Sequence, residues 1–247
     1  MGPGGAVSVA VGRREKELMG GRGVLLGAVV LYVATCGMAN AATIIDDFSQ
    51  GGFSVAVYAN STTGTVQQPV ANVLGGMRYG SVAVPAGGIQ IEGLDNVQLS
   101  SFPTASILNY ESSVGADGTA GVRYYNDDQF IGDLSGALFI QIDFSLVDLG
   151  LGGPMDVTVS LEDGADNAAA LLQTITTATP QSLVFPFAAF SGIGSLNLAD
   201  LHEVEIQFDP GQAADFRVTQ IIADVPEPTA LALLALGALG ALRRRAR

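Results

Sequence analysis

Residues 138–144 read Leu-Phe-Ile-Gln-Ile-Asp-Phe, and every second side chain from Leu138 onward is apolar. A period of two places these side chains on one face of an extended strand that buries that face. The same period recurs in residues 53–57, 157–161 and 204–208. Turns rich in glycine, proline and aspartate separate the runs, and no stretch has the period of a long amphipathic helix. The sequence therefore predicts about ten short strands in an all-β fold, an antiparallel β-sandwich or jelly roll.

The segment from Ala42 to Asp224 is strongly acidic. It holds three arginines against 21 carboxylates, which gives a formal net charge of −18. Such a charge disfavours nucleic acid as a partner and favours solubility, cations or basic partners. The only lysine, Lys16, and the only cysteine, Cys36, precede this segment. The segment therefore has no disulfide, no thiol nucleophile and no cysteine metal ligand.

The N-terminal 41 residues have the pattern of a signal peptide. A charged stretch after Met19 precedes an apolar run, and small residues follow at Ala39, Ala41 and Ala42. This order predicts that signal peptidase cuts after Ala41, and that translation starts at Met19.

Two other interpretations of the N-terminal segment stay open. A permanent membrane helix is one, but the apolar stretch 24–38 is shorter than the roughly 20 residues that a span needs. A lipoprotein signal ending at Cys36 is the other, although Thr35 before the cysteine fits that pattern poorly.

The C-terminal residues 225–247 combine three features. Pro226-Glu227-Pro228 comes first, an apolar run follows at 229–242, and the chain ends in four arginines, Arg243, Arg244, Arg245 and Arg247. This order closely resembles the PEP-CTERM sorting signal of Gram-negative bacteria. The prolines block a helix and keep the motif extended. A helix over 229–242 would span about 21 Å, less than the roughly 30 Å of a bilayer core, so the transmembrane anchor should be temporary.

The resemblance implies a route for the protein. The arginines would stay in the cytoplasm, which places the preceding chain on the outer face of the inner membrane. An exosortase would then cut near Pro226-Glu227-Pro228, and the protein would pass to the cell surface or the extracellular medium. The alternative is an ordinary tail anchor.

The strand order from Leu138 to Asp224 is similar to that of carbohydrate-binding jelly rolls. Tyr110, Tyr124 and Tyr125 are the candidates for stacking on a sugar, with Asp127 and Asp128 as acceptors for hydroxyl groups. Tyr124 and Tyr125 fall on opposite faces of one strand, so one ring can be exposed. The alternative is a structural tyrosine pair that caps the sandwich.

The segment 42–224 is rich in carboxylate and amide oxygens and has no cysteine, and such oxygen ligands favour calcium over softer metals. Many carbohydrate-binding jelly rolls carry a structural calcium ion between the first and last strands. The resemblance therefore implies Asp46, Asp47 and Asp224 as calcium ligands in this chain. Asp163, Asp166 and Asn167 form a second cluster, which we interpret as a hairpin turn.

No residue pattern indicates catalysis. The single histidine, His202, has no Gly-x-Ser-x-Gly motif to serve, and nothing selects one carboxylate pair for glycoside hydrolysis. The sequence thus predicts a non-enzymatic surface or matrix protein. The alternatives are a carbohydrate-binding module of an exopolysaccharide matrix or biofilm, and, less favoured, a polysaccharide hydrolase.

Overall fold

A computed structural model describes residues 42–58, 63–84, 96–151 and 153–224. These residues belong to one compact unit, Ala41–Pro226. The predicted signal peptide at 1–41, the Pro226-Glu227-Pro228 motif and the predicted membrane helix at 229–242 lie outside the described residues. Among the helices that the described residues form, none has the length and apolarity needed to cross a membrane.

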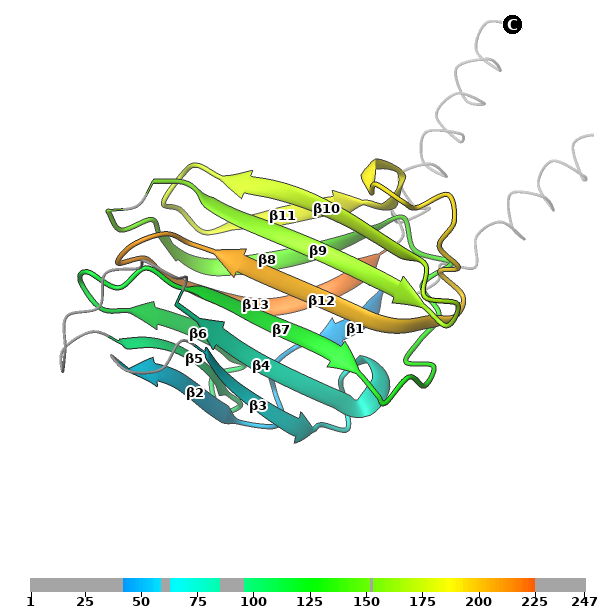
Figure 1. The fold of residues 1–247 in the computed structure, drawn as a ribbon, viewed down its shortest axis with the longest axis horizontal. Coiled ribbons are helices and arrows are strands. Elements are labelled where there is room, and N and C mark those ends of the chain that lie inside the picture. Colours follow the sequence, from blue (N-terminus) through cyan, green and yellow to red (C-terminus); the bar gives the residue numbers. More distant parts are fainter. Residues whose placement is uncertain (1–41, 59–62, 85–95, 152, 225–247) are drawn as a thin grey trace, which may run out of the picture. The chain divides into compact units, whose positions relative to one another are not determined.

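The described chain forms two antiparallel sheets that lie face to face (Figure 1). The seven-stranded sheet contains, in spatial order, β11 (Gln181–Pro186), β8 (Phe139–Asp148), β13 (Asp215–Asp224), β6 (Ile107–Ser112), β5 (Asn96–Phe102) and β2 (Phe53–Tyr58), with β1 (Thr43–Asp46) paired to β13. The six-stranded sheet contains β10 (Ala168–Ile175), β9 (Met155–Asp163), β12 (Leu201–Asp209), β7 (Thr119–Tyr125), β4 (Met77–Ala83) and β3 (Thr63–Pro69). Two short 3₁₀ turns, η1 (Leu74–Gly76) and η2 (Phe187–Ala189), complete the described elements.

The connections cross repeatedly between the sheets. From β6 to β13 each strand lies in the sheet opposite its predecessor, apart from the β9–β10 hairpin. This interleaving is characteristic of jelly-roll sandwiches. The predicted all-β sandwich is therefore confirmed.

The core lies between the sheets and follows the predicted alternation. Ile140, Ile142 and Phe144 of β8 point inward and are buried, whereas Leu138 precedes the strand and is 56% exposed. Leu138 was therefore wrongly placed in the buried face, because the strand begins one residue later. Aromatic rings join the layers: Phe216 packs 4.6 Å from the ring of Phe208 across the sandwich.

Strand β4 shows how the sandwich tolerates an unusual inward face. Gly80 faces the core, and a Cβ atom there would lie 2.5 Å from the ring of Phe53 on β2. The missing side chain makes room for this ring from the opposite sheet. The next inward position toward the start of β4 is occupied by Arg78, which is 1% exposed.

Candidate functional site

Strands β4 and β7 carry arginine and tyrosine on both of their faces. In their register, Arg78 lies opposite Tyr124 and Tyr79 lies opposite Arg123. Because successive side chains of a strand alternate, the first pair points into the core and the second points to solvent. Two clusters of similar composition therefore lie on opposite faces of the same strand pair.

The buried cluster consists of Asp46, Arg78 and Tyr124. Arg78 donates from Nε to Oδ2 and from Nη2 to Oδ1 of Asp46, each at 2.6 Å. The Tyr124 hydroxyl donates to Oδ2 at 2.9 Å, and the Phe48 amide donates to Oδ1 at 2.8 Å. Burial raises the pKa of the Asp46 carboxyl, while these hydrogen bonds oppose the rise.

The third guanidinium nitrogen of Arg78 connects this cluster to the chain that follows β1. Nη1 donates to the carbonyl oxygens of Gln50 at 3.2 Å and Gly51 at 2.8 Å. It also donates to Ser101 Oγ of β5 at 3.3 Å. The cluster thus ties the segment after β1 to both sheets.

The predicted calcium ligands do not fit a calcium ion. Both carboxylate oxygens of Asp46 accept hydrogen bonds from Arg78, and Asp47 Oδ1 accepts from the amide and hydroxyl of Ser49. Strands β1 and β13 are neighbours as expected, but Asp46 pairs with Ile221, three residues or about 10 Å along the strand from Asp224.

The rest of the described chain likewise offers no acidic metal site. Among the described residues, no group of three or more His, Cys, Asp or Glu side chains is placed to hold a metal. An arginine, supplied by a strand that the sequence reasoning did not consider, occupies the cation position beside Asp46.

The second acidic cluster is the hairpin turn that we predicted. Asp163, 2% exposed at the end of β9, accepts from the amides of Ala165 at 2.9 Å and Asn167 at 3.0 Å. It also accepts from the Asn197 amide at 2.8 Å. These donors lower the pKa of Asp163 to about 2.

Two of the three tyrosines predicted to stack on sugar are in the core. Tyr110 and Tyr124 are fully buried, and Tyr110 stacks on Phe216 at a centroid distance of 5.0 Å. Their hydroxyls donate to buried acceptors, for Tyr110 the carbonyl of Gly118 at 2.9 Å. Neither ring is available to a ligand, because a partly apolar ring at an inward position packs against the opposite sheet.

Tyr125 lies on the outer face together with the predicted acidic residues. Its hydroxyl donates to Asp128 Oδ1 at 2.6 Å, which raises the pKa of Tyr125. Asp127 and Asp128 have φ values of 45° and 58°. With the hydrogen bond from the Gln129 amide to the Asn126 carbonyl, these angles define a type I′-like turn. The structure thus brings Tyr125 and Asp128 together.

Sequence reasoning missed two residues beside Tyr125. The Arg123 guanidinium lies 5.0 Å from the ring centre of Tyr79 and 5.2 Å from that of Tyr125. The two rings meet edge to face at 6.2 Å, and Arg123 Nη1 lies 3.7 Å from Glu203 Oε2. We call Tyr79, Arg123 and Tyr125 the tyrosine–arginine cluster. The alternation of Tyr79 with Ser81 and Ala83 was the available signal for this outward face.

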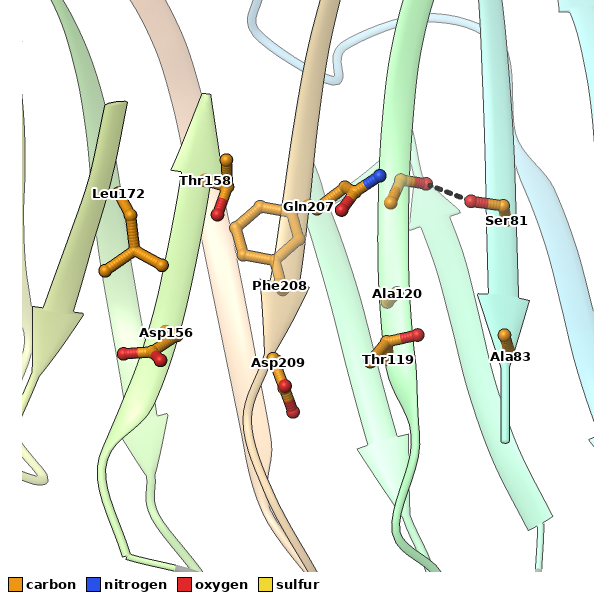
Figure 2. Close-up of a pocket in the computed structure, with 11 residues that line it drawn as sticks. Ser81, Ala83, Thr119, Ala120, Asp156, Thr158, Leu172, Gln207, Phe208 and Asp209 are labelled. Carbon is orange, nitrogen blue, oxygen red and sulfur yellow. Dashed lines mark hydrogen bonds between the residues drawn. The ribbon is translucent and has the colours of Figure 1, made fainter. Parts of the chain in front are cut away.

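Two residues along β4 and β7 from Tyr79 and Arg123, on the same outer face, Ser81 and Gly121 lie opposite each other. They line one end of a trough in the six-stranded sheet (Figure 2). Its volume is about 330 Å³, and strands β10, β9, β12, β7 and β4 contribute to it. It is lined by Ser81, Ala83, Thr119, Ala120, Gly121, Asp156, Thr158, Leu172, Gln207, Phe208 and Asp209.

Small residues create the trough. Gly121 of β7 has no side chain, and a Cβ atom there would lie 2.9 Å from Ser81 Oγ of β4. The Ser81 hydroxyl donates to the Gly121 carbonyl at 3.4 Å. Larger residues border this low region, including Gln207 and the exposed Leu172 (Figure 2).

The outer face of the seven-stranded sheet differs, because its polar side chains bond to one another. Arg217 donates to Asn109, which donates to Glu111. Asp143 accepts from three neighbours, Gln141, Ser182 and Gln220. Groups that are already paired in this way offer less to a ligand than the trough does.

The described residues thus define a two-sheet, acidic β-sandwich protein with a polar trough on the outer face of its six-stranded sheet. Residues 224–246 match the family model of the PEP-CTERM protein-sorting motif. The chain therefore carries a PEP-CTERM sorting signal, which indicates an exported protein that is anchored in a membrane before an exosortase processes it.

Solved structures with a similar arrangement include carbohydrate-binding modules. The family 11 module of the cellulosomal cellulase Lic26A-Cel5E of Clostridium thermocellum is 14% identical, with a TM-score of 0.38 over 75% of this chain and 95% of that one. The solution structure of CtCBM11 is 16% identical, with a TM-score of 0.42 over 76% and 99%. The agarase AgWH50C is 10% identical, with a TM-score of 0.40 over 53% and 23%. No curated protein matches the chain in sequence. At these scores the similarity assigns neither a ligand nor an activity to this chain.

Proposed function

We propose that this protein is a non-enzymatic component of the cell surface or extracellular matrix, and that its sandwich binds a polysaccharide on the outer face of the six-stranded sheet. The observation that carries the proposal is the trough beside the tyrosine–arginine cluster. The trough offers hydroxyl, amide and carboxylate side chains, and the adjoining cluster offers the partly exposed rings of Tyr79 and Tyr125. Sugars need both hydrogen-bond partners and apolar faces.

The extent of the trough favours a polymer over a single sugar. It crosses five neighbouring strands, from Leu172 on β10 to Ser81 on β4. At about 4.8 Å between strands this distance is about 19 Å. The surface is therefore long enough to hold several units of a chain.

The placement of the carboxylates supports a binding role without hydrolysis. Glycosidases place two carboxyl groups on opposite sides of the scissile bond. Asp156 and Asp209 are cross-strand neighbours on one sheet face, so both lie on the same side of any chain bound there. His202, at the start of β12, lies 3.6 Å from the exposed Asp200 and outside the trough.

Processing at both ends completes the proposed function. Signal peptidase would cut after Ala41, the domain 42–224 would be exported, and the tail 225–247 would hold it in the inner membrane with its arginines in the cytoplasm. An exosortase would cut near Pro226-Glu227-Pro228 and pass the domain to the surface or the medium. This division into 1–41, 42–224 and 225–247 is itself part of the proposal.

Mass spectrometry of the mature termini tests the processing. In a host with a matching exosortase, we expect a protein that starts at Ala42 and ends near Pro226-Glu227-Pro228. An intact Arg247 in the presence of the active exosortase would contradict it and identify the tail as a plain membrane anchor.

Affinity electrophoresis of the mature protein on a polysaccharide panel tests the binding role. Gln207→Ala in the trough should weaken retention, whereas Gln141→Ala on the seven-stranded sheet is the matched control and should not. Retention that is equal in the two variants would place the binding elsewhere, and release of reducing sugar ends by the wild type would contradict the non-enzymatic role.

A further inference from the structure

The outer face of the six-stranded sheet carries two cross-strand pairs of like charge. In the register of β9 and β12, Asp156 lies opposite Asp209, and Glu162 lies opposite Glu203. Like charges that lie directly opposite each other in a sheet are destabilising. A folded domain that keeps two such pairs on one face has a surface suited to a positively charged ligand.

The two pairs differ in how the protein compensates them. Arg123 lies 3.7 Å from Glu203, so the glutamate pair has a cation of its own. The ion pairs of the described residues include neither Asp156 nor Asp209. Within the part of the chain that the structure describes, Asp156 accepts a hydrogen bond only from the Thr174 hydroxyl, at 2.6 Å, which brings no charge. The aspartate pair therefore remains electrostatically uncompensated.

This uncompensated pair lines the trough. Asp156 and Asp209 both contribute to its wall, beside the Thr158 hydroxyl and the Gln207 side chain (Figure 2). Burial and the neighbouring carboxylates Asp117 and Asp156 raise the pKa of Asp209, as expected where negative charge is concentrated.

We infer that the trough takes a glycan with free ammonium groups, an amino-sugar polymer, and that Asp156 and Asp209 bind its cation. The inference rests on the proposed polysaccharide-binding function and specifies the class of polymer. An ammonium group has three donors, which the two carboxylates and the Gln207 carbonyl can accept. Uronic acid polymers are disfavoured, because the face and the whole segment 42–224 are acidic.

Isothermal titration of the mature protein in EDTA-containing buffer tests this inference. The probes are hexamers of β-1,4-linked glucosamine, of its N-acetylated form, of neutral glucose and of glucuronic acid. We expect the glucosamine hexamer to bind about tenfold more tightly than the N-acetylated hexamer at low salt. The difference should shrink as salt is added.

The double variant Asp156→Asn, Asp209→Asn separates binding from folding. Removing the repulsion should raise the Tm, so a loss of glucosamine affinity cannot be attributed to unfolding. We expect the variant to lose the tenfold preference and to keep its affinity for the N-acetylated hexamer. Glu111→Gln on the seven-stranded sheet is the matched control and should keep the preference.

Each outcome has a separate meaning. Equal binding of the glucosamine, N-acetylated and neutral hexamers, or tightest binding of the glucuronic acid hexamer, would overturn the inference and leave the proposed function standing. Failure of every hexamer and of the whole polysaccharide panel would overturn the proposed function. Tight binding of glucosamine that survives in the double variant would overturn the assignment to the aspartate pair.

Discussion

The two faces of the β4–β7 strand pair use the same residue types under opposite conditions. In the buried cluster, Arg78 and Asp46 have side chains 0% and 1% exposed and a contact of 2.6 Å. On the outer face, Arg123 and Glu203 have side chains 41% and 19% exposed and lie 3.7 Å apart. The comparison teaches that the position on the strand, and not the residue type, decides whether an arginine is held in the core by a carboxylate or lies exposed to solvent.

Because the two ion pairs differ in exposure, they should contribute differently to the free energy of unfolding. A buried ion pair gains little over an apolar pair, but removing one partner leaves an uncompensated charge in the core. An exposed pair is solvated and screened, so either partner can be removed at small cost. The buried cluster should therefore control stability, and the outer cluster should control binding.

The largest expected effect is on the buried cluster. Asp46→Ala leaves Arg78 buried without its carboxylate, and we expect the free energy of unfolding to fall by about 3–5 kcal/mol. Guanidinium denaturation measures this fall. Replacing both partners, Asp46→Ala with Arg78→Met, should recover part of the loss. If the single variant lost less than about 1 kcal/mol, the contrast between the two faces would not hold.

A buried carboxylate without an arginine sharpens the comparison. Asp163 is held by amide donors alone, and its pKa is lowered to about 2 from an ordinary value of 3.8. Its contribution to stability is therefore complete above about pH 4 and is lost as the pH falls toward 2. The free energy of unfolding should be measured as the pH falls from about 5 to about 2. It should fall more steeply for the wild type than for Asp163→Asn. Parallel curves would contradict this role.

How far the sequence could predict these features depends on how local their causes are. The runs in β8, β9 and β12 alternate clearly, because apolar burial alone sets their register. In β4, Met77 and Tyr79 alternate with Arg78 and Gly80, and hydrophobicity alone would bury the first pair. Arg78 is buried because its guanidinium forms an ion pair with the carboxylate of Asp46, 32 residues earlier in the chain. A long-range ion pair of this kind leaves no local periodicity.

The burial of Asp46 likewise depends on a feature that the local pattern does not reveal. The pairing of β1 with β13 shifts between Ile44 and Asp46, and this irregularity leaves both Ile45 and Asp46 buried. Strict alternation would have placed Ile45 and Asp46 on opposite faces. The placement of Tyr124 and Tyr125 on opposite faces was predicted correctly, because it follows from strand geometry alone.

A moderate effect on binding is expected for the outer cluster. Tyr79→Ala removes one ring from beside Arg123 and should lower the affinity for the glucosamine hexamer about tenfold, or ~1.4 kcal/mol. Because the ring is partly exposed, the free energy of unfolding should change by only about 1 kcal/mol. Titration and denaturation of one preparation measure both. A large loss of stability with unchanged affinity would reverse the roles assigned to the two faces.

A smaller effect is expected for the exposed ion pair. Arg123→Gln should lower the free energy of unfolding by less than about 1 kcal/mol at low salt, and the difference should vanish near 1 M salt. Arg217→Gln, on the seven-stranded sheet, is the control and loses a hydrogen bond to Asn109 without an ion pair. A salt-independent loss of several kcal/mol would show that Arg123 is structural, like Arg78.

The smallest expected effect concerns metal ions. Since Arg78 already supplies the cation beside Asp46, neither EDTA nor millimolar calcium should shift the Tm of the wild type. Differential scanning calorimetry with and without each additive measures the shift. A clear rise in Tm with calcium that Asp46→Asn abolishes would mean that the carboxylate exchanges its arginine for a metal. The buried cluster would then be a ligand site, and the two faces of the strand pair would differ only in which cation they bind.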